Sequence, residues 1–141
     1  MEKTVILVVE DEAIIRLATA ALLEDAGYTV IEAGNADVAI QMLGSRTDIG
    51  AVFTDIVMPG SLDGLRLVQA IRDRWPPIHL LITSGRNGMV QKDFPRKARF
   101  LPKPYTPKHV LKALAELFDI DPASRHNRHN VAGECDRLIL P

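Results

Sequence analysis

The sequence predicts an α/β fold, a doubly wound five-stranded parallel sheet flanked by about five helices. Short runs of β-branched and aliphatic residues recur along the chain, and segments with apolar residues at helical spacing lie between them. Most of these runs are continuous rather than alternating, which is typical of strands buried on both faces of a parallel sheet. Regular alternation of such strands with helices specifies a doubly wound sheet.

The first half of the chain contains three predicted strands and two helices. The strands are residues 4–9 (TVILVV), 29–33 (TVIEA) and 50–54 (GAVFT). Residues 13–26 have helical periodicity, and Gly27 follows them at a position where helices commonly end in glycine. Asn35 is a suitable N-cap for a second helix that continues to Leu43. The third strand leads directly to Asp55.

The second half contains the remaining elements. Two further strands are predicted at residues 78–83 (IHLLIT) and 99–101. A third helix is expected at about 63–74, and the two prolines that follow would terminate it. Segment 85–98 contains two glycines and a proline, so any helix there is short or irregular. The last helix begins with Thr106 as N-cap and Pro107 at its first position, and runs to about Phe118.

Length and composition favour one ordinary domain. The chain has 141 residues, of which 47% are hydrophobic and 25% charged, and a net charge of −1 that argues against non-specific nucleic-acid binding. A single cysteine, Cys135, excludes an internal disulfide and favours a reducing compartment. The sequence lacks a signal peptide and a membrane-spanning run, so a cytoplasmic location is expected. We predict a domain at 1–120 and a polar tail at 121–141, either disordered or forming an interface.

Charged or hydroxyl-bearing residues stand at the ends of four of the five predicted strands. They are Glu10, Asp11, Asp55, Thr83 and Lys103. Because ligands of open α/β sheets bind beyond the carboxyl ends of the strands, these side chains should converge. Three carboxylates together favour a hard divalent cation such as Mg²⁺ or Mn²⁺. A metal, a lysine and a hydroxyl form a site for a phosphoryl group, and a carboxylate at its centre can act as nucleophile.

Four motifs carry a family resemblance. They are V-V-E-D-E at residues 8–12, T-D-I-V-M-P-G-S-L-D-G at 54–64, I-T-S-G at 82–85, and F-L-P-K-P-Y at 100–105. In this order and spacing they resemble the receiver domain of bacterial two-component response regulators, over residues 3 to about 119. The resemblance implies a flavodoxin-like sheet with strand order 2-1-3-4-5.

The resemblance also implies the metal and acceptor residues. Asp55 would be the phosphoacceptor and a metal ligand. Asp11 would bind Mg²⁺ directly, Glu10 directly or through water, and Val57 through its backbone carbonyl. Glu10 occupies a position where many relatives have aspartate, and the segment after Asp55 is one residue longer than the commonest form, because of Gly60-Ser61.

Further roles concern the phosphoryl group and the response to it. Lys103 would pair with the phosphoryl group, and Thr83 would hydrogen-bond one of its oxygens and move to do so. Phe100 would be the aromatic switch residue that follows Thr83, although a phenylalanine lacks the hydroxyl of a tyrosine. Tyr105 matches a second aromatic after the Lys-Pro pair.

The function expected from these residues is a stand-alone phosphoacceptor switch rather than an enzyme. A histidine kinase or phosphotransfer protein would donate the phosphoryl group to Asp55, and the product would bind an unknown downstream protein. Direct contact with nucleic acid or a membrane is not expected. The amphipathic last helix and the apolar residues 138–140 make a homodimer possible.

Two other kinds of protein would need residues that this sequence lacks. A flavin-binding protein would need a hydroxyl- and glycine-rich loop where Glu10, Asp11 and Glu12 stand. A haloacid-dehalogenase-type phosphatase would need a second aspartate at the position of Val57. Taken singly, each site residue could be an ordinary helix-start, turn or surface residue. His126, His129 and Cys135 lack the paired spacing of structural zinc sites.

Overall fold

A computed structural model describes residues 5–56, 64–84 and 98–120. Five parallel strands form one sheet in the order β2-β1-β3-β4-β5, which confirms the predicted fold class and strand order. The strands are β1 (Val5–Val9), β2 (Thr29–Ala33), β3 (Ile49–Asp55), β4 (His79–Ser84) and β5 (Ala98–Pro102).

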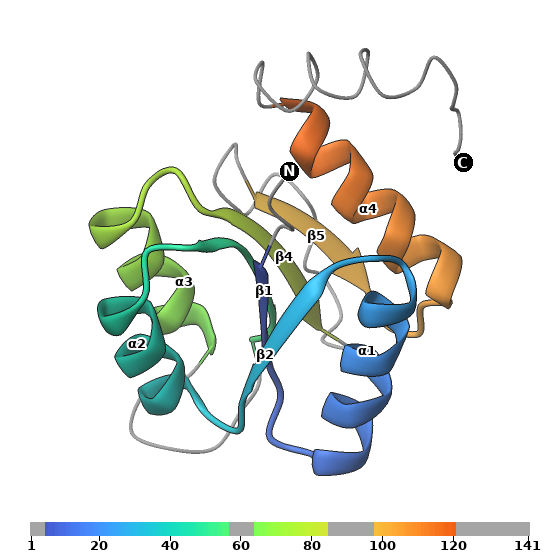
Figure 1. Cartoon of the computed structure of the whole chain (residues 1–141), viewed down its shortest axis with the longest axis horizontal. Helices are drawn as coiled ribbons and strands as arrows, with labels where there is room; N and C mark the ends of the chain where they lie inside the picture. Colours follow the sequence, from blue (N-terminus) through green and yellow to red (C-terminus); the bar gives the residue numbers. More distant parts are fainter. Residues whose placement is uncertain (1–4, 57–63, 85–97, 121–141) are drawn as a thin grey trace.

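Helices cover both faces of this sheet. The four helices in the described ranges are α1 (Ala13–Asp25), α2 (Ala36–Ser45), α3 (Gly64–Arg74) and α4 (Pro107–Ile120). Helices α1 and α4 lie on one face and α2 and α3 on the other (Figure 1). The segment predicted to hold a short or irregular helix lies outside the described residues, apart from Ala98, which begins β5.

The predicted caps are present at three helices. The Asn35 Oδ1 atom accepts a hydrogen bond of 2.9 Å from the backbone N–H of Val38, and the Thr106 Oγ1 atom accepts one of 3.3 Å from His109. Gly27 follows α1 with φ of 102°, a left-handed conformation that suits glycine. These local signals therefore fix where the helices begin or end.

Element ends differ slightly from the prediction. Strand β3 has 7 residues where five were predicted, and β5 has 5 where three were predicted. The extra residues lie in register with residues of neighbouring strands, and sequence periodicity carries no information on that pairing. None of the described helices has both the length and the apolar character needed to cross a bilayer.

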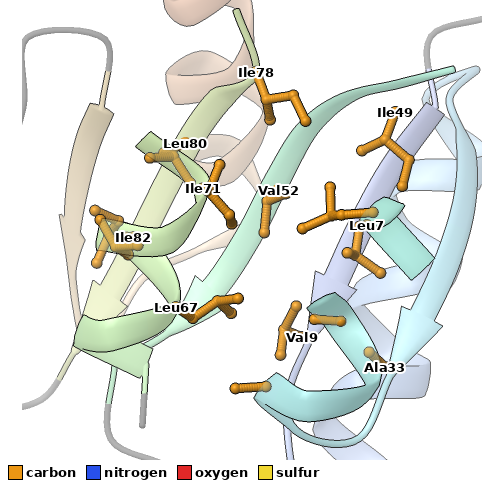
Figure 2. Close-up of a cluster of buried hydrophobic side chains, with 14 of the residues drawn as sticks. Leu7, Val9, Ala33, Ile49, Val52, Leu67, Ile71, Ile78, Leu80 and Ile82 are labelled. Atoms are coloured by element: carbon orange, nitrogen blue, oxygen red, sulfur yellow. The ribbon is translucent and has the colours of Figure 1, made fainter. Parts of the chain in front are cut away.

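The sheet separates two apolar clusters. Successive residues of a strand point to opposite faces. Val5, Leu7 and Val9 of β1 therefore join the cluster under α2 and α3, whereas Ile6 and Val8 join the cluster under α1 and α4. Figure 2 shows the first cluster, in which α3 packs its apolar side against β3 and β4. Burial on both faces explains the continuous apolar runs and holds the strand ends in register.

Candidate functional site

Strand register brings four of the predicted site residues, Glu10, Asp55, Thr83 and Lys103, to one edge of the sheet. Asp55 is level with Thr83 across the β3–β4 pair. Val9 is level with Thr54, so Glu10 leaves β1 beside Asp55. Lys103 directly follows β5 on the far side of β4. The carboxyl ends of the parallel strands thus bring together residues that are far apart in the sequence. Glu10 and Lys103, for example, are separated by 93 positions.

A carboxylate and a lysine meet at the centre of this edge. The Lys103 Nζ atom lies 2.6 Å from the Asp55 Oδ2 atom, and the Asp55 side chain is 8% exposed. Burial by itself would lower the pKa of Lys103. The hydrogen bond and charge of Asp55, with the charge of Glu10, outweigh burial and raise this pKa. Lys103 is therefore held as a cation against Asp55.

Glu10 is the second buried carboxylate. Its side chain accepts a hydrogen bond of 3.2 Å from the backbone N–H of Glu12, and the residue is 6% exposed. Burial raises the pKa of Glu10, and so do a hydrogen bond with Asp11 and the charge of Asp55, although the Glu12 N–H and Lys103 oppose this. The charge of Asp55 thus disfavours the ionised form of Glu10, whereas the charge of Lys103 favours it.

Oxygen donors at this edge suit a hard divalent cation. Glu10 and Asp55 supply buried carboxylates, whose mutual repulsion such a cation would relieve. Asp11 is exposed, and within the described ranges no three His, Cys, Asp or Glu side chains are grouped as for a bound metal. Val57, whose carbonyl was predicted as a ligand, lies outside those ranges.

Thr83 carries a buried hydroxyl with no hydrogen-bond partner among the described residues. The residue is 3% exposed and lies level with Asp55. In contrast, the hydroxyl of Thr54 donates to the carbonyl oxygen of Asp55 at 3.0 Å. An unmade hydrogen bond of a buried group costs about 1–3 kcal/mol. The Thr83 hydroxyl is thus available to an oxygen-bearing ligand beside Asp55.

Phe100 lies elsewhere in the sheet. It is level with Ile82 rather than with Thr83, and it belongs to the cluster under α2 and α3. Its 9% exposure makes it part of the core in this structure. The role of Phe100 as a switch therefore stays a prediction.

Helix α1 contacts the site through Thr19 and Arg16, which lie outside the sequence motifs. Tyr105 is half-buried, with its ring centroid 6.0 Å from that of Phe53, and it hydrogen-bonds Thr19 of α1. Burial raises the pKa of the Tyr105 hydroxyl. Arg16 of α1 donates to the carbonyl oxygen of Glu10 at 2.8 Å. The sequence signal for these contacts was a polar residue, Thr19 or Arg16, on the side of a mainly apolar helix that faces the sheet.

Gly64 begins α3 directly against the site. A Cβ atom there would overlap the carbonyl oxygen of Asp55 and the backbone of Ile56. Only a glycine allows α3 to approach the acceptor strand so closely. Its occurrence at the start of an otherwise regular helix was the sequence signal for this contact.

Comparisons with known proteins agree with this arrangement. The response regulator receiver domain family matches residues 6–115. The chain is 33% identical over 120 residues to the sensor kinase CckA of Brucella abortus, covering 81% of this chain and 12% of that protein. It is also 33% identical to the regulatory protein ResD of Bacillus subtilis, covering 82% of this chain and 48% of that one. The chain thus spans less than half the length of these curated relatives.

Solved structures show the same fold. A response regulator receiver protein from Sinorhizobium medicae superposes with a TM-score of 0.75 at 30% identity, covering 82% of this chain and 94% of that one. The receiver domain of the hybrid histidine kinase CckA gives a TM-score of 0.68 at 29% identity, covering 80% and 97%. Family match, strand order and the acidic edge with its lysine agree: the chain belongs to the response regulator receiver domain family.

Proposed function

We propose that this receiver domain accepts a phosphoryl group on Asp55 in a Mg²⁺-dependent reaction and changes its protein contacts in response. The contact between Lys103 and Asp55 carries the proposal. It joins a buried carboxylate at the end of a central strand to a lysine whose pKa is raised. The Thr83 hydroxyl lies at the same level and supports the proposal, since none of the described residues hydrogen-bonds to it.

The chemistry assigned to Asp55 is nucleophilic. A carboxylate oxygen attacks phosphorus in a phosphohistidine of the donor, the P–N bond breaks as an acyl phosphate forms, and the histidine takes up a proton. Lys103 balances the negative charge of the transferred group. The Thr83 hydroxyl donates a hydrogen bond to one of its oxygens.

Mg²⁺ is the cofactor that we propose, as is general for receiver domains. Glu10, Asp11 and Asp55 would hold it, together with the carbonyl of Val57. When bound, the ion supplies neutralisation of charge on the transferred phosphoryl group. Mn²⁺ shares the preference for oxygen ligands and is the alternative.

Partners follow from the same proposal. Receiver domains interact with histidine kinases or phosphotransfer proteins and with downstream effectors. The CckA relative is named a sensor kinase, and others are named NtrX-like response regulators. We propose a protein donor, a protein target, a homodimer as one form of output, and a cytoplasmic location.

The test is an intact-mass measurement. The protein is incubated with Mg²⁺ and acetyl phosphate beside Asp55→Asn, with Asp48→Asn as a matched control because Asp48 pairs with Arg46 on the surface. We expect one phosphoryl adduct on the parent and on Asp48→Asn, none on Asp55→Asn, and none after chelation of Mg²⁺. An adduct on Asp55→Asn would mean that the acceptor is another residue.

A further inference from the structure

The backbone of Glu10 is held on both sides as it leaves the sheet. Its N–H donates to the carbonyl oxygen of Ala33 in β2 at 3.1 Å. Its carbonyl oxygen, one residue beyond the end of β1, accepts a hydrogen bond of 2.8 Å from the Arg16 Nη1 atom. The Glu10 side chain therefore departs from a peptide unit fixed by two neighbouring elements.

Arg16 is itself held in place. Its Nε atom donates to the Glu32 Oε1 atom at 3.3 Å, and the two side chains are 22% and 33% exposed. A Cβ atom on Gly34 would lie 3.3 Å from the Arg16 Nη1 atom, so the missing side chain leaves room for the guanidinium. The Nε and Nη1 atoms of one planar guanidinium thus bridge Glu32 of β2 and the carbonyl oxygen of Glu10, the residue that follows β1.

We propose that Arg16, oriented by Glu32, is a positioning residue for the divalent-cation site. By fixing the carbonyl of Glu10 it sets the direction in which the Glu10 carboxylate leaves β1. This inference rests on the proposed function, because it treats Glu10 as a Mg²⁺ ligand. An arginine is needed because a lysine has one nitrogen and cannot donate from two points of a rigid plane.

Because Arg16 is positively charged, the two roles that it could have change the affinity for Mg²⁺ in opposite directions when it is removed. If Arg16 acted only as a nearby cation, its removal would strengthen the binding of Mg²⁺, because a positive charge repels the ion. If Arg16 positions Glu10, its removal weakens binding. Loss of groups that orient metal ligands typically weakens metal affinity about 10–100-fold.

Calorimetric titration with Mg²⁺ measures this on the whole chain. We expect Arg16→Met to raise the Mg²⁺ dissociation constant about tenfold, and Arg16→Lys to recover only part of the loss. Arg46→Met is the matched control, because Arg46 forms its pair with Asp48 on the exposed surface, and should bind as the parent does. Glu32→Gln keeps an oxygen that accepts from Arg16 and should bind nearly as the parent does, whereas Glu32→Met should not.

Kinetics separate positioning from a general loss of structure. In the acetyl phosphate reaction we expect Arg16→Met to raise the half-saturating Mg²⁺ concentration about tenfold, with the rate at saturating Mg²⁺ within about twofold of the parent. Circular dichroism checks that each variant is folded. If Arg16→Met does not fold, Arg16→Lys and the two Glu32 variants carry the same test.

Unchanged or tighter Mg²⁺ binding by folded Arg16→Met would overturn the positioning role and leave the proposed function intact. Equal binding by Glu32→Gln and Glu32→Met would overturn the part assigned to Glu32. A parent protein that binds no Mg²⁺ would overturn the metal dependence in the proposed function, and this inference with it.

Discussion

Two buried threonines on neighbouring strands differ in a single hydrogen bond. Thr54 donates to the Asp55 carbonyl oxygen, whereas the Thr83 hydroxyl has no partner among the described residues. Replacement by the isosteric valine should therefore cost about 1 kcal/mol at Thr54 and be neutral or stabilising at Thr83. Urea unfolding of Thr54→Val and Thr83→Val measures both. A clear loss of stability in Thr83→Val would mean that its hydroxyl has a partner in solution.

The buried carboxyl group of Glu10 should make the free energy of unfolding depend on pH. Its pKa in the folded protein is raised, first by burial. Its contribution to stability is therefore fully present below its ordinary pKa and is lost as pH rises through the raised value. In buffer without divalent cations, Glu10→Gln should have a higher Tm than the parent at pH 8, and the difference should shrink toward pH 4. Parallel pH profiles of the two proteins would contradict this.

At the scale of elements, two glycines give opposite predictions. Gly64 begins α3 where a Cβ atom would overlap the Asp55 carbonyl, whereas Gly44 lies exposed in α2 with nothing within 4 Å of the added atom. Gly64→Ala should lose about 1–3 kcal/mol through overpacking, and its acceptor site should react more slowly. Gly44→Ala should gain about 0.5–1 kcal/mol from helix propensity. Chemical unfolding measures both, and equal effects would contradict the close approach of α3.

Local signals explain why the elements could be predicted from the sequence. Buried strands show as continuous apolar runs, and the cap at Asn35 and the left-handed glycine at Gly27 need only neighbouring residues. Strand ends were less accurate, because they depend on hydrogen bonds to other strands. Strand order came from the family resemblance rather than from periodicity.

The residues of the site could be predicted from the sequence only in part. Sequence motifs predicted that Asp55 and Lys103 would meet, because both follow strands of one parallel sheet. They did not predict Arg16, since its contacts with Glu10 and Glu32 depend on how α1 packs against β2. Likewise, the exposure of Asp11 is set by tertiary packing.

At the scale of the whole molecule, both apolar clusters share one sheet. A residue of β1 and its neighbour in sequence belong to different clusters, so neither cluster can open without disturbing the strands that support the other. Unfolding should therefore be a single cooperative transition. The site inherits this rigidity because its residues lie at the ends of those strands.

This cooperativity leads to a prediction about the domain boundary. Within the ranges that the structure describes, all members of both clusters lie before residue 120. A chain of residues 1–120 should therefore fold with a Tm within a few degrees of the full chain, and should take a phosphoryl group from acetyl phosphate at a similar rate. Differential scanning calorimetry and intact mass measure the two properties.

A second truncation provides the control. A chain that ends at residue 106 lacks α4 and with it Val110, Leu114 and Leu117, which are each 0% or 1% exposed. Their loss would leave the face of the sheet beside α1 uncovered, so this chain should aggregate or fail to unfold cooperatively. If the 1–120 chain behaved like the 1–106 chain, residues after 120 would be part of the folded unit, and the predicted boundary would be wrong. If it behaved like the full chain, the acceptor chemistry would belong to the first 120 residues alone.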